Sequence, residues 1–506
     1  MSGLQWTTIS TAVNILAQIL NMIVLSRLLE SKEFGMVALG NSIVDFGYFF
    51  ATMGLSQALV QKENLTEIDI RALFTLSLLF GGTVFGALWI GMPFYIEYLY
   101  PESNIPTLTA VSRWLSLSIL FYAFSMIQGA IVKRNFDFKR NAIFSFVIAV
   151  GNSLLVIIFA YLGFEVWSLV IGALWQSGAM FVSYLYLSKR WFILPIFDAK
   201  AFKPFLVYGG NLSLNSIIEY VNQTLDTALI GRFSGEAKVG IYRRVNMLFY
   251  LPSYHLTTTI TKVLFPAISR MQNDKPRMRE NFIRLVFFLS IIIFPLAGGI
   301  AVAAENVILI ALGTKQNWVS GADLLRVYGF ASVLNMITMQ SGVVCDATAY
   351  LRPKLILNIL YMPVISVLFY VFRGYDLIGF AYALLIAEII RNLGYAYLMR
   401  RVLELDYFTY YKTLIPALLM CALVSGSIYG ATAIGTSFQF NYVFSFILQL
   451  TAGAISLGVA MLLPIPMLQK QMTWIMKKLS EGYINPKILK LANWYIRLLN
   501  RQTKPV

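Results

Sequence analysis

Fourteen long apolar segments constrain the fold of this chain more than any other feature of its sequence. Each holds roughly the 20 residues that an α-helix needs to cross the hydrocarbon core of a bilayer. Apolar residues make up 58% of the chain and charged residues 13%, whereas soluble domains carry about 25% charge. The sequence therefore predicts an all-α, polytopic membrane protein with about 14 transmembrane helices, over residues 5–28, 36–60, 72–99, 107–131, 141–162, 166–188, 205–230, 239–264, 284–304, 324–345, 354–372, 376–398, 412–434 and 440–463.

Basic residues gather in every second connection between these segments. Of the 40 Lys and Arg residues, 29 lie in 62–71, 132–140, 189–204, 262–284, 352–354, 400–412 and the stretch after 464. Positively charged loops stay on the cytoplasmic side, so we expect a multi-pass protein with both termini in the cytoplasm. The net charge of +16 then belongs to loops that face anionic lipid, and no nucleic-acid partner is expected. Residues 464–506 read as a basic amphipathic cytoplasmic tail, either lying on the inner leaflet or simply solvated.

An internal repeat appears when the sequence is shifted by 205 residues. The shift spans six predicted helices, and an even number preserves the orientation of the second copy. We therefore expect two parallel six-helix lobes, at 1–190 and 191–400, followed by two extra helices (401–463) and the tail (464–506). The aligned polar and glycine positions are Asn14 with Glu219, Gln18 with Gln223, Asn21 with Asp226, Arg27 with Arg232, Gly35 with Gly240, and Asn41 with Asn246.

Two of these segments carry polar stripes. The seventh has Glu219, Asn222, Gln223 and Asp226 at helical spacing, and the first has Asn14, Gln18 and Asn21. Side chains at such spacing share one helical face. A charge at mid-membrane costs about 2.5–3.5 kcal/mol, so the two carboxylates favour a hydrated cavity between the lobes. The neutral amides are equally well explained by hydrogen bonds between packed helices.

Other charges also fall inside predicted spans: Asp45, Arg113, Arg243, Arg244, and Glu388 with Arg391 and Asn392. Glu388 and Arg391 are three residues apart, so one interpretation is that they neutralise each other. Arg243 and Arg244 point about 100° apart on a helix. One can then face a cavity while the other extends toward the outer interface. The planar fork of Arg binds two phosphate oxygens, so a cavity with several Arg residues suits a phosphate-bearing substrate.

The motifs of the common enzyme classes are missing from the sequence. It has no GxxxxGK[ST] loop, no HExxH and no DxD-type metal motif, and His255 is its single histidine. Cys345 and Cys421 lie in apolar stretches and read as buried thiols. We therefore predict no catalytic residue, no metal site and no cofactor; the chain is not expected to be an enzyme.

Several segments together resemble a known family of membrane proteins. The chain resembles the polysaccharide transporter family (the Wzx-type flippases, especially the colanic acid exporter branch) of the multidrug/oligosaccharidyl-lipid/polysaccharide exporter superfamily, over about residues 1–400. The residues that carry the resemblance are LSRLLESKEFGMVALG (25–40), GLSQALVQKENLTEIDIRALFTLSLL (54–79), VKRNFDFKR (132–140), LGFEVWSLV (162–170), LIGRFSGEAKVGIYRR (229–244), VLFPAISRMQND (263–274) and LLRVYGFASVLNMITMQSGVVCDATAYLR (324–352).

The resemblance implies a V-shaped bundle whose two lobes expose a cavity to each membrane face in turn. It implies flipping or export of an undecaprenyl-diphosphate-linked repeat unit across the bacterial inner membrane, for exopolysaccharide or O-antigen synthesis. Membrane lipids are further partners, and a polysaccharide polymerase and a chain-length regulator are candidate ones. Two alternatives stay open: a cation-coupled drug antiporter, which typically has twelve spans, and a non-transporting subunit of a polysaccharide synthesis complex.

Site residues follow from the resemblance and the stripes together. The resemblance implies that cavity cations bind the diphosphate, a role extended here to Arg27, Arg113, Arg243 and Arg244. Asn14, Gln18 and Asn21 are candidates for lining the sugar path. The candidates for a coupling ion, Na⁺ or H⁺, are the carboxylates Glu219, Asp226, Asp45 and Glu388.

Overall fold

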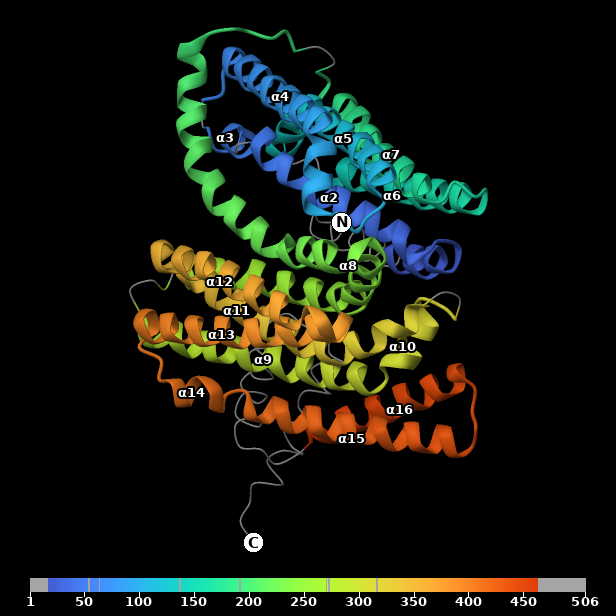
Figure 1. The fold of residues 1–506 in the computed structure, drawn as a ribbon. Helices are drawn as coiled ribbons and strands as arrows, with labels where there is room; N and C mark the ends of the chain where they lie inside the picture. Colours follow the sequence, from blue (N-terminus) through green and yellow to red (C-terminus); the bar gives the residue numbers. More distant parts are fainter. Residues whose placement is uncertain are drawn as a thin grey trace. The chain divides into compact units, whose positions relative to one another are not determined.

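The computed structural model describes residues 17–52, 55–62, 64–135, 138–190, 193–269, 271, 274–314 and 317–462. Within these residues the regular structure is helical throughout, with no strand (Figure 1). The predicted all-α fold is therefore confirmed. Asn14 and the basic tail 464–506 lie outside the described residues, so their predicted roles stay predictions.

Helices cover every predicted span that the structure describes. Among the described residues, ten stretches are long and apolar enough to cross a membrane, and the longest, Leu351–Leu403, contains two long helices in succession. The chain is a multi-pass membrane protein. In chain order the helices are Ala17–Leu28, α2 (Ser31–Thr52), α3 (Leu55–Gln61), α4 (Glu67–Leu99), α5 (Ile105–Arg134), α6 (Phe138–Tyr161), α7 (Val166–Ser188), α8 (Ala199–Ser269), α9 (Lys275–Val302), α10 (Ala304–Ala311), the 3₁₀ turn η1 (Asn317–Gly321), α11 (Ala322–Ala347), α12 (Leu351–Phe372), η2 (Arg373–Tyr375), α13 (Asp376–Leu403), α14 (Tyr407–Lys412), α15 (Ile415–Ser437) and α16 (Tyr442–Met461).

Helix boundaries follow local chemistry. Thr66 caps α4: its hydroxyl accepts from the backbone of Asp69, whose carboxylate accepts from the backbone of Thr66 at 2.9 Å. This reciprocal capping box satisfies two backbone donors that a helix start leaves without partners. Asn104 caps α5 and Asn441 caps α16 in the simpler one-way form.

The predicted seventh and eighth segments lie on one continuous element, α8, which is broken at Gly235. This glycine has φ 74° and ψ 178°, a conformation that is essentially restricted to glycine because it has no Cβ. The break falls inside the polar turn RFSGEAKVG that separates the two predicted spans. The break at Gly235 therefore takes the place of the loop that was expected between the two spans.

The described residues fall into two compact units. The first unit runs up to Met247 and includes Ala311–Gly321 and Asn358–Ala383; the second unit has Leu248–Ile310, Ala322–Leu357 and the rest from Leu384. A core cluster with Leu73, Met126 and Phe205 lies in the first unit. A larger cluster with Phe282 and Met420 lies in the second. The repeat-based boundaries at residues 190 and 400 stay a prediction.

The repeat is visible as a reciprocal backbone contact within the first unit. Gly35, at the start of α2, packs against the carbonyl of Glu236, and Gly240 packs against the carbonyl of Ser31. Ser31 and Glu236 are themselves one repeat apart, as are the two glycines. A contact in which i meets j and j meets i is the mark of a two-fold relation. It agrees with two parallel copies. A Cβ at either glycine would overlap the facing carbonyl.

Candidate functional site

Two carboxylates and one arginine from three predicted spans interact in the first unit. Arg243, beyond the break in α8, interacts electrostatically with Asp45 on α2 and with Asp226, before the break. The hydroxyl of Tyr242 donates a hydrogen bond to the Asp226 carboxylate. We call Asp45, Asp226, Tyr242 and Arg243 the Asp–Arg cluster. It brings together three residues that the sequence nominated separately.

The local sequence explains this convergence. Gly235 turns α8 back on itself, so Asp226 and Tyr242 can meet although 16 positions separate them. Gly35 and Gly240 let the start of α2 approach the second half of α8 to backbone contact. Glycines permit both features because they lack a side chain. The site is therefore specified by three glycines as much as by the charges themselves.

Exposure separates the members of the cluster. Tyr242 is fully buried, whereas the side chains of Asp45 and Arg243 are exposed. Asp45 lies within Ser31–Ala51, one of the stretches able to span a membrane. A charge facing lipid at that depth costs about 2.5–3.5 kcal/mol.

Asp226 is held by local donors as well as by Tyr242. Its Oδ1 accepts from the backbone nitrogen of Thr227 at 2.5 Å and from the Thr227 hydroxyl at 3.1 Å. Nearby, the hydroxyl of Tyr220 donates to the backbone carbonyl of Ser42 at 2.8 Å. The carboxylate is thus fixed in place, which favours a defined role over a freely moving charge.

Arg244 takes a different direction from its neighbour Arg243. Its guanidinium carbon lies 3.6 Å from the centre of the Phe34 ring, and its side chain is half-buried. A cation over an aromatic face is stabilised by the ring's quadrupole. The two arginines point in different directions, as adjacent helical residues must. The contact of Arg244 with Phe34 connects α8 to α2.

The other predicted cations and amides of the first unit have partners of their own. Arg113 donates from Nε to the carbonyl of Trp89 at 2.8 Å and lies over that ring. Arg27 donates to the carbonyl of Ile23 at 2.9 Å. Asn21 donates to the Ser153 hydroxyl at 2.7 Å, and Gln18 is exposed. The structure does not gather these residues around Arg243.

The seventh-segment stripe divides between contacts and solvent. Asn222 donates to the carbonyl of Asn358 on α12 at 3.1 Å. Glu219 and Gln223 have exposed side chains, whereas Asp226 is held in the Asp–Arg cluster. The contact of Asn222 fits the helix-packing interpretation, whereas the hydrated cavity expected around Glu219 and Asp226 stays a prediction.

Glu388 belongs to a buried network in the second unit. It is 4% exposed and accepts hydrogen bonds from Asn335 at 3.1 Å and from Arg391 at 3.2 Å. Asn392, the next residue after Arg391, forms hydrogen bonds with the hydroxyls of Tyr410 and Tyr411. This matches the interpretation in which Glu388 and Arg391 neutralise each other.

Sequence reasoning missed the role of Tyr242. The only signal was a tyrosine directly before two arginines in an otherwise apolar segment. A buried phenol usually finds a hydrogen-bond partner, but the break at Gly235 was needed to reveal which one.

The chain is similar in sequence to a family of known proteins. A family model described as "Polysaccharide biosynthesis protein" matches residues 24–321. The chain is 27% identical over 420 residues to an "Uncharacterized membrane protein in cps region" of Klebsiella pneumoniae, covering 79% of this chain and 82% of that one. It is 23% identical over 423 residues to the "Lipopolysaccharide biosynthesis protein WzxC" of Escherichia coli (strain K12), covering 82% and 84%.

One solved structure has a similar fold over nearly the whole chain. The "Lipid II flippase MurJ, inward closed conformation" aligns with a TM-score of 0.73 at 15% sequence identity, covering 90% of this chain and 97% of that one. At this identity the similarity concerns the fold.

Proposed function

Because this chain belongs to the polysaccharide biosynthesis protein family, we propose that it moves a lipid-linked oligosaccharide across the bacterial inner membrane. The chain has two chemically different demands to meet. The glycan and its diphosphate require a hydrated, cation-bearing path, whereas a prenyl tail is soluble in the bilayer. The observation that carries the proposal is the exposure of two charges that interact electrostatically: Asp45, on a stretch long and apolar enough to span a membrane, and Arg243 on α8. The largely apolar helices would supply the surface beside which the prenyl tail stays in the bilayer.

Arg243 is the residue best suited to the diphosphate. Its guanidinium offers several N–H donors in a planar fork that matches a phosphate edge. The charges of Asp45 and Asp226 attract this guanidinium and so compete with a phosphate for it. Two carboxylates against one Arg leave the cluster with a net negative charge, which repels a diphosphate. Neutralising one or both carboxylates releases Arg243 for the substrate.

This competition provides a route for coupling to an ion. A proton or Na⁺ bound at Asp45 or Asp226 removes negative charge from the cluster, and so raises its affinity for phosphate. Ion and substrate then favour each other's binding, and such a coupling free energy is reciprocal. Glu219 is a further candidate on the same helix, whereas the neutralised position of Glu388 favours a structural role. No covalent step enters this function.

Orientation completes the proposal. The distribution of Lys and Arg among the loops supports cytoplasmic termini. The substrate would be loaded at that face and released on the other, where a polymerase and a chain-length regulator would receive it. The lipid carrier proposed is undecaprenyl diphosphate, and the pathway is exopolysaccharide or O-antigen synthesis.

The test uses the full chain reconstituted in liposomes with a fluorescent, prenyl-diphosphate-linked disaccharide. We expect the labelled lipid to cross to the protected leaflet faster than in protein-free liposomes. Deleting the gene should also leave lipid-linked repeat units on the cytoplasmic face. Unassisted rates in the liposomes, together with export of a cationic drug by the same preparation, would establish the antiporter instead.

A further inference from the structure

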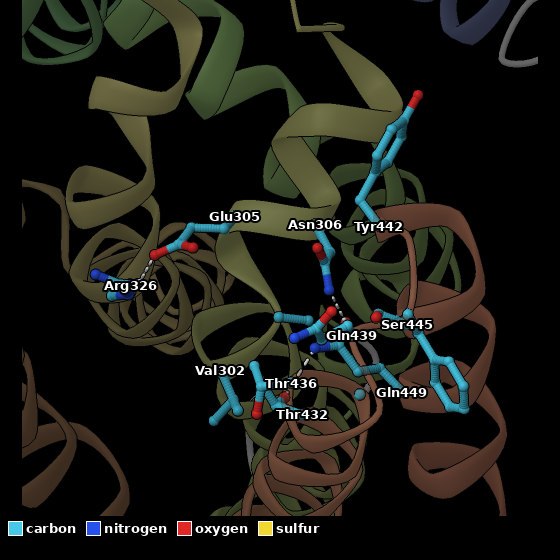
Figure 2. A pocket seen from close by; sticks show the side chains of 13 residues that line it. Val302, Glu305, Asn306, Arg326, Thr432, Thr436, Gln439, Tyr442, Ser445 and Gln449 are labelled. Carbon is cyan, nitrogen blue, oxygen red and sulfur yellow. Dashed lines mark hydrogen bonds and ion pairs between the residues drawn. The ribbon is translucent and has the colours of Figure 1, made fainter.

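A polar cavity lies in the second unit, and none of its lining residues belongs to the Asp–Arg cluster. It has a volume of about 470 Å³, within the range of about 300–1,000 Å³ that ligand sites occupy. It is formed where α9 gives way to α10 and where α15 turns into α16 (Figure 2). We call it the amide pocket, after its lining residues Asn306, Gln439 and Gln449.

The floor of the amide pocket is a fixed set of hydrogen bonds. Gln449 is 2% exposed; it accepts from Asn306 Nδ2 at 3.1 Å and donates to the Thr432 hydroxyl at 2.8 Å. Thr432 in turn donates to the carbonyl of Ile428. Figure 2 shows Asn306 and Gln449 directed toward one another from α10 and α16. These groups are therefore oriented before any ligand arrives, which lowers the entropic cost of binding.

The rim offers capacity for further hydrogen bonds. Each primary amide has two N–H donors and a carbonyl acceptor. Among the described residues, Asn306 uses one of its amide hydrogens in a hydrogen bond and the Gln439 side chain uses none. Phe440 and Tyr442 add aromatic surface beside these amides. Amides, hydroxyls and an aromatic edge together suit a ring that carries hydroxyl groups on an apolar carbon frame.

The charges at the pocket exclude an anionic occupant. Arg326 donates to Glu305 at 2.6 Å and also to Asp323. One cation against two carboxylates leaves a negative surplus. A phosphate or an anionic lipid headgroup would meet repulsion here, whereas a neutral ligand meets none. The carboxylate of Glu305 can still accept a hydrogen bond from a hydroxyl.

We propose that the amide pocket binds a neutral sugar ring of the transported glycan. The inference rests on the proposed function and deepens it, because both connections that form the pocket lie on the face expected to be away from the cytoplasm. The Asp–Arg cluster would handle the diphosphate, and the amide pocket would hold the glycan on the exit side. A sugar held there is less free to return with its carrier.

Binding is tested directly on the purified full chain in detergent micelles, with neutral methyl glycosides of hexoses and N-acetylhexosamines as probes. We expect saturation-transfer NMR signals from at least one glycoside. Gln439→Ala and Asn306→Ala should each weaken its affinity by about fivefold, the value of one lost hydrogen bond. Asn317→Ala, an exposed amide in the same connection but outside the pocket lining, should leave the affinity unchanged.

Three outcomes overturn the assignment. Either no glycoside gives a signal, or the signal survives in both pocket variants. Displacement of the glycoside by inorganic pyrophosphate would also overturn it, because the charges at this pocket repel that anion. None of these results depends on the liposome transport assay. A failure of sugar binding with normal flipping therefore rejects the amide pocket and keeps the proposed function.

Discussion

Arg243 is the side chain on which the proposed substrate binding depends most. It is exposed, it interacts with Asp45 and Asp226, and its neighbour Arg244 is committed to Phe34. Within the Asp–Arg cluster Arg243 is therefore the cation that we propose for the phosphate. The sequence identified the arginine pair, and the structure separates the two roles.

Replacing Arg243 should impair transport without unfolding the protein. We expect Arg243→Gln to reduce flipping at least tenfold, a loss of about 1.4 kcal/mol or more, because charge-assisted hydrogen bonds contribute about 1.5–3 kcal/mol. Arg243→Lys should retain part of the activity, since it keeps the charge but loses the fork. The liposome assay measures both variants. Wild-type rates in Arg243→Gln, at equal protein content, would remove Arg243 from the substrate path.

Tyr242 tests the coupling role of Asp226. Removing its hydroxyl in Tyr242→Phe takes one donor from the Asp226 carboxylate. We expect a severalfold change in the cation or proton concentration that gives half-maximal flipping, with little change in the maximal rate. Tyr98→Phe, at an exposed tyrosine of α4, is the control. An identical ion dependence in Tyr242→Phe and wild type would show that Asp226 does not bind the coupling ion.

At the scale of the elements, glycines determine how α2 and α8 meet. Gly235 interrupts α8, and Gly35 and Gly240 let backbone touch backbone. Both members of this last pair were visible in the repeat alignment, although nothing in their sequence indicated a mutual contact. A second trace of the repeat was missed: Glu165 and Asp376 each begin a helix with positive φ (48° and 56°) after GF and GY. They are 211 residues apart, so the single shift of 205 residues passed over them.

Substitutions at these glycines distinguish the effect of steric crowding on stability from the effect of helix propensity. We expect Gly35→Ala or Gly240→Ala to destabilise the protein by about 1–3 kcal/mol, because the new methyl group overlaps a carbonyl that cannot move aside. Gly86→Ala on α4 has open space around its Cβ and should be neutral or slightly stabilising. Thermal unfolding in detergent compares the three. Equal stability of Gly35→Ala and Gly86→Ala would mean that the crossing can widen.

At the scale of the whole molecule, the sequence predicted far more of the fold than of the site. Apolar length alone located the helices, because spanning a bilayer leaves few alternatives. The site depends on contacts between residues far apart in sequence, such as Asn222 with Asn358. It also depends on which side chains already have a partner, such as Arg113, which donates a hydrogen bond to the Trp89 carbonyl. Periodicity shows which face of a helix a residue occupies, but not which residue of another helix it contacts.

Trp318 illustrates such a distant contact and gives a prediction at this scale. It is fully buried, and its indole nitrogen donates to the carbonyl of Ser26, 292 positions earlier, at 3.1 Å. We expect Trp318→Ala to cost about 3–5 kcal/mol and Trp318→Phe to cost less, since the ring volume is largely kept. Trp114→Ala, at a half-exposed tryptophan, should change stability little. Equal melting temperatures for all three variants would contradict this ranking.

The reciprocal glycine crossing has an evolutionary consequence. Since main-chain atoms make the contact on both sides, the surrounding side chains are under no pressure from it and can diverge freely between the duplicated halves. The two glycines cannot. Distant relatives that descend from the same duplication should therefore keep a pair of small residues one repeat apart. We expect this pair even where the two copies share no other sequence similarity.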